Sequence, residues 1–146
     1  MKKSLLPTTF YALIGVFIVI ICMFFVPAVS EFVQGPLLFL SPFIIFSLLG
    51  AALIFLTVKS KIKGKHRKLL LLTGVSAAGF FVSIVLHNLL YALAIVASHI
   101  IILKYIFEFL HAVFFILAIV VCPLGFLIGA IGCTTIFINK RKSNPI

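Results

Sequence analysis

The chain has few charged residues for its length. Of its 146 residues, only 10% are Asp, Glu, Lys or Arg, whereas 64% are hydrophobic. A soluble domain contains about 25% charged and about 45–50% apolar residues, so this composition excludes an ordinary water-soluble globular fold. With His left aside, charge is absent from four stretches: 4–30, 32–58, 69–103 and 109–139. Each stretch is longer than the roughly 20 residues with which a helix crosses about 30 Å of hydrocarbon.

Paired cysteines and catalytic motifs are also missing from the sequence. Cys22, Cys122 and Cys133 lie in charge-free stretches and form no C-x-x-C pair, which indicates buried thiols rather than a disulfide framework or a thiol redox centre. There is no motif for nucleophilic catalysis, phosphate binding or dinucleotide binding. The two acids, Glu31 and Glu108, are far apart in the sequence. We therefore expect neither an enzyme nor a bound cofactor.

The four charge-free stretches predict an all-α fold, an integral membrane four-helix bundle that forms one domain over residues 1–146. The predicted spans are about 10–29, 36–58, 69–91 (or on to 97) and 112–138. The first span has the flanks of a signal peptide, with Lys2 and Lys3 before it and small residues at Ala28 and Ser30 after it. Its apolar core is longer than the usual run of about 7–15 residues in a signal peptide, so we expect this span to be retained.

Positive charge is concentrated in three short segments. Of the 12 Lys and Arg residues, all but Lys104 lie in 2–3, 59–68 or 140–142. Nucleic-acid binding would need a folded basic surface, so we expect no nucleic-acid partner. Because cytoplasmic loops hold the excess of Lys and Arg, the pattern predicts a multi-pass protein of a prokaryotic cell membrane with both termini in the cytoplasm. The basic loop 59–68 is expected to contact anionic lipid headgroups, at about 1 kcal/mol for each basic residue near the surface.

Polar and small residues recur at helical spacing in the third and fourth predicted spans. Steps of three or four place one set on a single face of the third span: Thr73, Ser76, Gly79, Ser83 and His87. A longer stripe on the fourth span runs from Lys104 through Cys122 to three glycines: Gly125, Gly129 and Gly132. Small residues let membrane helices approach closely, so both stripes predict helix packing. The alternatives are a polar cavity between the stripes or a dimer seam.

The depth of the ionisable side chains decides which of them can meet. A rise of 1.5 Å per residue places His87 and Asn88 at the outer edge of the hydrocarbon and His111 farther out. Matching depths sets His87 opposite residues 118–122, which argues against a contact between His87 and His111.

The segment 99–111 is mostly apolar, with a narrow polar stripe at Lys104, Glu108 and His111. We favour a short helix that lies in the outer interface with this stripe in water. The alternative is an outward extension of the fourth span in which Lys104 and Glu108 pair.

Four outer residues are of types that suit Zn²⁺: His87, His99, Glu108 and His111. Their spacing matches no ligand pattern, so we expect histidines that are satisfied by neighbours such as Asn88 or Tyr91, and no metal. A haem between two histidines is disfavoured by the mismatch of depth.

Function is the least determined property of this sequence. We expect an interaction or accessory subunit that packs through the small-residue faces of the third and fourth spans, either as a homo-oligomer or in a larger membrane complex. One alternative is a small oligomeric transporter or channel along Ser76, Ser83 and His87, and another is an outer-face metal-binding protein. The candidate functional residues are His87, Asn88, Ser76, Ser83, Glu108 and His111.

Overall fold

The chain is helical throughout its described length. The computed structural model describes the backbone of residues 2–32 and 35–143, and the side chains of 5–29, 31, 35 and 37–139. Its elements are α1 (Lys2–Phe25), α2 (Pro27–Phe32), α3 (Pro36–Lys59), α4 (Lys65–Val96), the 3-10 turn η1 (Ala97–His99), α5 (Ile101–Ile116), the π-helical η2 (Leu117–Val121) and α6 (Cys122–Ser143). This confirms the all-α prediction.

Four helical segments are long and apolar enough to cross a membrane: Leu5–Phe25, Leu37–Lys59, Lys65–His99 and Ile101–Asn139. The last two have 35 and 39 residues, or about 50 and 60 Å at 1.5 Å per residue. Both exceed the roughly 30 Å of the hydrocarbon core. The third and fourth candidate helices therefore extend well beyond the residues that we predicted to span the membrane.

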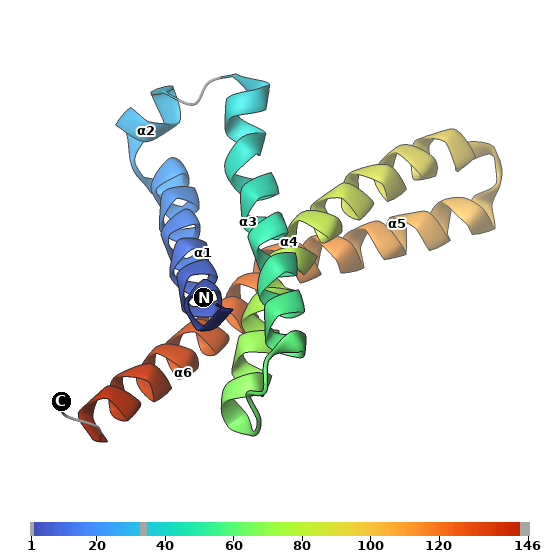
Figure 1. Cartoon of the computed structure of the whole chain (residues 1–146). Coiled ribbons are helices and arrows are strands. Elements are labelled where there is room, and N and C mark those ends of the chain that lie inside the picture. Colours follow the sequence, from blue (N-terminus) through green and yellow to red (C-terminus); the bar gives the residue numbers. More distant parts are fainter. Residues whose placement is uncertain (1, 33–34, 144–146) are drawn as a thin grey trace.

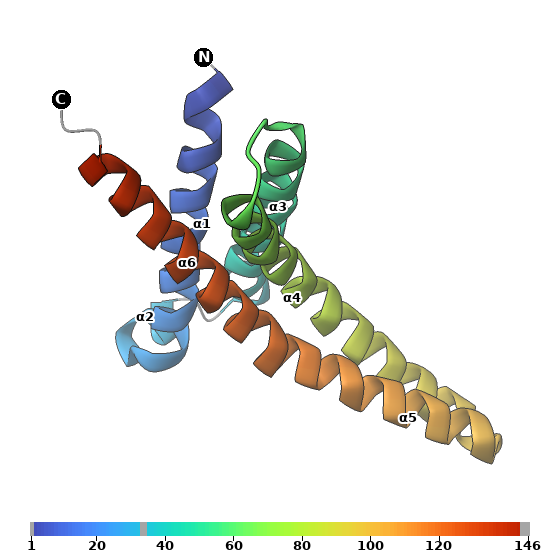
Figure 2. The ribbon, with the colours of Figure 1, turned by 90° about the horizontal axis from the view of Figure 1, so that it is seen from below.

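The helices α5, η2 and α6 follow one another without a break and form one long rod (Figure 2). The π-helical turn ends at Val121, two residues before Pro123, whose missing N–H and ring disturb the hydrogen bonds of the preceding turn. Residues 101–111 are thus not a separate interfacial helix, and our favoured expectation for this segment is wrong. The physical reason is that the face of Lys104, Glu108 and His111 turns toward α4.

α4 lies antiparallel to this rod, and α1 and α3 cover only part of the pair (Figure 1). α3 packs against α4, and α1 packs against α3. Rings join α1, α3 and α6 in the core, where the centroid of Phe126 lies 4.5 Å from that of Phe17 and 5.1 Å from that of Phe46. No residue of α5 is buried. A four-helix bundle, which we call the inner bundle, is therefore formed by α1, α3, α6 and the N-terminal half of α4.

The C-terminal end of α4, η1 and the start of α5 form a two-helix hairpin, which we call the arm (residues 91–111). Figures 1 and 2 show it extending clear of α1 and α3. Its tip at η1 lies at the opposite end of α4 from the basic loop that precedes Lys65. The fold thus separates a covered inner bundle from an arm that only its own two helices support.

Gly50 and Gly74 mark a close crossing of α3 and α4. A Cβ atom at Gly50 would lie 2.7 Å from the backbone nitrogen of Ala78 and 2.8 Å from the carbonyl oxygen of Gly74. Nearby, the Ser47 hydroxyl donates a hydrogen bond of 3.2 Å to the carbonyl of Ala78. Only glycine permits this approach, which fixes α3 on the inner half of α4.

Candidate functional site

The small-residue stripe of α6 lies against the polar stripe of α4, and we call this contact the seam. From the start of α4 toward the arm, the facing pairs are Leu69 with Gly132, Thr73 with Gly129, Ser76 with Gly125, and Gly79 with Cys122. A Cβ atom at Gly129 would lie 2.9 Å from the backbone nitrogen of Thr73 and 3.0 Å from the carbonyl oxygen of Leu69. Glycine is therefore required at Gly129 for the two backbones to approach so closely.

Polar side chains in the seam find partners within it or on their own helix. The Thr73 hydroxyl donates to the carbonyl of Leu69 at 2.9 Å, and it also interacts with the Cys133 thiol. The Ser83 hydroxyl interacts with the Cys122 thiol across the seam. Ser76 and Ser83 are 7% and 6% exposed. In the described chain these groups lie between packed helices rather than along an open path.

His87 and His111 meet at the end of the seam that is nearest the arm. Their rings stack with centroids 4.1 Å apart and an interplanar angle of 23°. Nδ1 of His87 lies 3.0 Å from the carbonyl oxygen of His111. A carbonyl oxygen only accepts hydrogen bonds, so Nδ1 of His87 carries a hydrogen. Each histidine ring also contacts a further aromatic ring. The centroid of Phe115 lies 5.2 Å from that of His87, and the centroid of Tyr91 lies 5.4 Å from that of His111.

The prediction that these two histidines do not meet is wrong. The prediction assumed that the start of α4 and Asn139 lie at the same depth, whereas in the structure Leu69, near the start of α4, packs against Gly132. The rod is therefore displaced along α4 by about two helical turns, which brings His111 to the level of His87 and Tyr91. The small residues of the seam set this register, and depth arithmetic on separate helices contains no information on it.

The other predicted outer residues are dispersed. Asn88 is exposed and its amide nitrogen donates to the carbonyl of Ile84 on its own helix, at 2.9 Å. His99 lies exposed in η1 at the tip of the arm. Across the residues that the structure describes, no three His, Cys, Asp or Glu side chains come close enough to hold a metal ion. The four weak metal candidates thus do not form one cluster.

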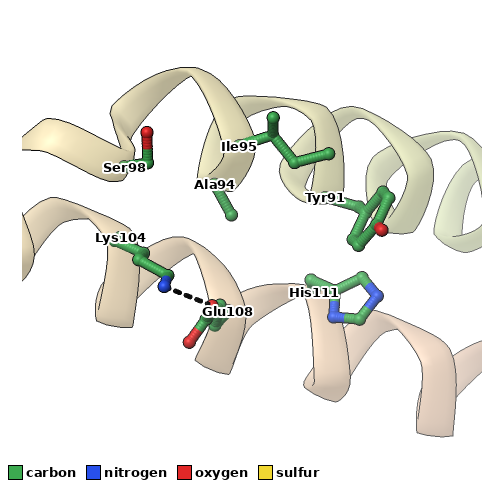
Figure 3. A pocket seen from close by; sticks show the side chains of 7 residues that line it. All are labelled: Tyr91, Ala94, Ile95, Ser98, Lys104, Glu108 and His111. Carbon is green, nitrogen blue, oxygen red and sulfur yellow. Dashed lines mark ion pairs between the residues drawn. The ribbon is translucent and has the colours of Figure 1, made fainter.

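Between the two helices of the arm lies a groove of about 630 Å³, which we call the polar groove. It is lined by Tyr91, Ala94, Ile95, Ser98, Lys104, Glu108 and His111 (Figure 3). Nζ of Lys104 lies 3.7 Å from Oε1 of Glu108, and the two side chains are 44% and 48% exposed. This distance is longer than the 2.7–3.2 Å typical of an N–H···O hydrogen bond. The pair is therefore loose and open to a third group.

A second groove of about 440 Å³, the aromatic groove, lies where the arm joins the bundle. Its wall includes Phe rings of four helices, together with His87 and Asn88, and its lining residues are Phe24, Phe39, Leu40, Phe43, Phe80, Phe81, Ile84, His87, Asn88, Phe115, Ala118 and Ile119. Sequence reasoning missed this groove. α1 and α3 are apolar on all sides, so no periodic signal distinguishes the rings that face it.

Comparison with known proteins gives no family for this chain. No family model, no curated protein and no solved structure matches it. Function is therefore argued from the two grooves, the seam and the arm alone.

Proposed function

We propose that this chain is a multi-pass subunit of a cell membrane and that its arm binds another membrane helix. Both termini and the basic loop 59–68 face the cytoplasm in this proposal, and the basic loop contacts anionic headgroups. The side chains of Lys59, Lys61 and Lys63 are exposed, as such contacts require. The partner helix belongs either to a second copy or to a larger membrane complex.

The observation that carries this proposal is that the arm lacks support from the rest of the chain. Its outer surface has large apolar side chains, with Ile102, Tyr105 and Phe109 exposed to 75%, 66% and 68%. Steps of three and four put these three residues on one face of α5. The tilt of a membrane helix is set by the helices that pack against it. A partner on this face would fix the tilt of the arm, as α1 and α3 fix that of the inner bundle.

The small-residue faces pack against each other within the chain and do not form an exposed interface for a partner. Gly125, Gly129 and Gly132 are occupied by residues of α4, so we move the partner site from these faces to the arm. The transport alternative has less support, because Ser76 and Ser83 are buried in the seam. The metal alternative has less support as well, since its four ligands are not gathered in the described chain.

Photo-crosslinking in intact membranes tests the partner site. A photoreactive phenylalanine analogue replaces Phe109 on the arm or, as a matched control, Phe55 on α3, which is 63% exposed. We expect a discrete protein adduct from position 109 and none from position 55. Two differently tagged copies distinguish self-association from another protein. The proposal is wrong if position 109 gives only lipid adducts or the same protein adducts as position 55.

A further inference from the structure

The two grooves lie one after the other along the same side of the rod. Lys104, Glu108 and His111 line the polar groove, and Phe115, Ala118 and Ile119 line the aromatic groove. These positions follow one another in steps of three, four or one, so they form one continuous helical face. The stacked rings of His87 and His111 stand at the junction, since His87 lines the aromatic groove and His111 the polar one.

The combined length of the grooves matches the length of one phospholipid. From Lys104 to Ile119 the rod advances about 22 Å at 1.5 Å per residue. A bilayer of two lipid layers with their headgroups is about 40–45 Å thick, so one lipid that lies along the rod is about 20–22 Å long. The order of polarity also matches, because the charged groove lies near the arm tip and the aromatic groove lies toward the bundle. A lipid has its headgroup and tails in the same order.

The polar groove offers one cation and one anion to a headgroup. The Lys104 ammonium can donate to a phosphate, and the Glu108 carboxylate can accept from an ammonium group. Their separation of 3.7 Å leaves both without a close hydrogen bond to the other. Tyr91 lines the same groove, and its hydroxyl is a further donor for phosphate. A quaternary amine has no N–H to donate to Glu108, so a primary amine is the better fit.

We propose that the two grooves together bind one phospholipid whose headgroup contains a phosphate and a primary amine, in the leaflet opposite the basic loop. Lys104 holds the phosphate, Glu108 holds the ammonium group, and a tail passes the two histidines to lie among the Phe rings of the aromatic groove. This proposal depends on membrane insertion but not on a protein partner for the arm. A negative crosslinking result would therefore leave it intact.

Native mass spectrometry of the full chain, titrated with lipids of one tail composition, tests this proposal. We expect phosphatidylethanolamine to bind more tightly than phosphatidylcholine by about tenfold, the effect of one charge-assisted hydrogen bond. Glu108→Gln should remove this preference, and Lys104→Met should weaken the binding of both lipids. Glu31→Gln is the matched control for Glu108→Gln, because Glu31 is exposed and lines neither groove. We expect this control to bind like the wild type.

The tail is tested separately from the headgroup. Phe39→Ala, in the aromatic groove, should weaken the binding of long-chain phosphatidylethanolamine. It should not change the preference of the protein for phosphatidylethanolamine over phosphatidylcholine. Free glycerophosphoethanolamine, which has the headgroup and no tails, should not bind measurably. Equal binding of the two lipids by the wild type, or an unchanged preference in Glu108→Gln, would overturn the proposal. So would binding of the free headgroup as tightly as the lipid, which would make a soluble phosphate-amine compound the ligand.

Discussion

The same two helices pack in different ways in the seam and in the arm. In the seam, Gly125 and Gly129 bring the rod onto the backbone of α4. In the arm, the facing positions carry Tyr91, Glu108 and His111, and these larger side chains line a groove of about 630 Å³. Lipid tails give helices no hydrophobic reason to associate, so close packing depends on small side chains. The seam therefore supplies stability, and the arm leaves space for a ligand.

The covering helices sharpen this difference between seam and arm. α3 crosses α4 closely at Gly50 and Gly74, and the ring of Phe126 is packed between those of Phe17 and Phe46. By contrast, α5 has no buried residue. A substitution that adds volume should thus have a large effect in the seam, an intermediate effect at the junction and a small effect in the arm.

The largest effect is expected from Gly129→Val in the seam. The added side chain would meet backbone atoms of Leu69 and Thr73 at about 3 Å, and these cannot move without separating the helices. We expect the free energy of unfolding to fall by about 3 kcal/mol, at the upper end of the usual cost of overpacking. Reversible unfolding in mixed detergent micelles measures it. Gly15→Val is the control, because a Cβ atom there has no neighbour within 4 Å, and equal losses in the two variants would contradict the close contact.

An intermediate effect is expected from His87→Ala at the junction of seam and arm. This substitution removes the hydrogen bond to the carbonyl of His111 and the ring stacking. The loss should be about 1–2 kcal/mol in the free energy of unfolding.

His111→Ala and Asn88→Ala complete this test. His111→Ala removes the stacking but keeps the backbone carbonyl, so its loss should be smaller than that of His87→Ala. Asn88→Ala should have almost no effect, because this exposed side chain bonds only to its own helix. If His87→Ala is as neutral as Asn88→Ala, the junction does not contribute to packing.

The sequence predicts the helices and their small-residue faces well because these depend on local periodicity. Four apolar helices and the helical spacing of Gly125, Gly129 and Gly132 follow from residue order alone. The register between helices depends instead on contacts across them. A displacement of two turns, set by Leu69 against Gly132, changed the neighbours of His87 and His111 completely.

The segment 99–111 illustrates a second limit of sequence reasoning. A narrow polar stripe on an apolar helix suits water at a membrane interface, and it suits equally a groove shared with another helix. The residues that decide between them, Tyr91 on α4 and Ser98 in η1, are mostly surrounded by apolar neighbours. Only the antiparallel packing of α4 on the rod brings these residues to the same groove as Lys104 and Glu108.

The smallest effect on stability is expected from Lys104→Met in the arm. Its ion pair with Glu108 has an N···O distance of 3.7 Å and is about half exposed, and such pairs at i, i+4 contribute about 0.3–0.5 kcal/mol. The free energy of unfolding without added lipid should therefore fall by no more than about 0.5 kcal/mol. The same variant should bind phospholipid less tightly, so that stability and binding are changed separately. A loss as large as that of Gly129→Val would mean that the arm, like the seam, stabilises the fold, and that its charges are structural.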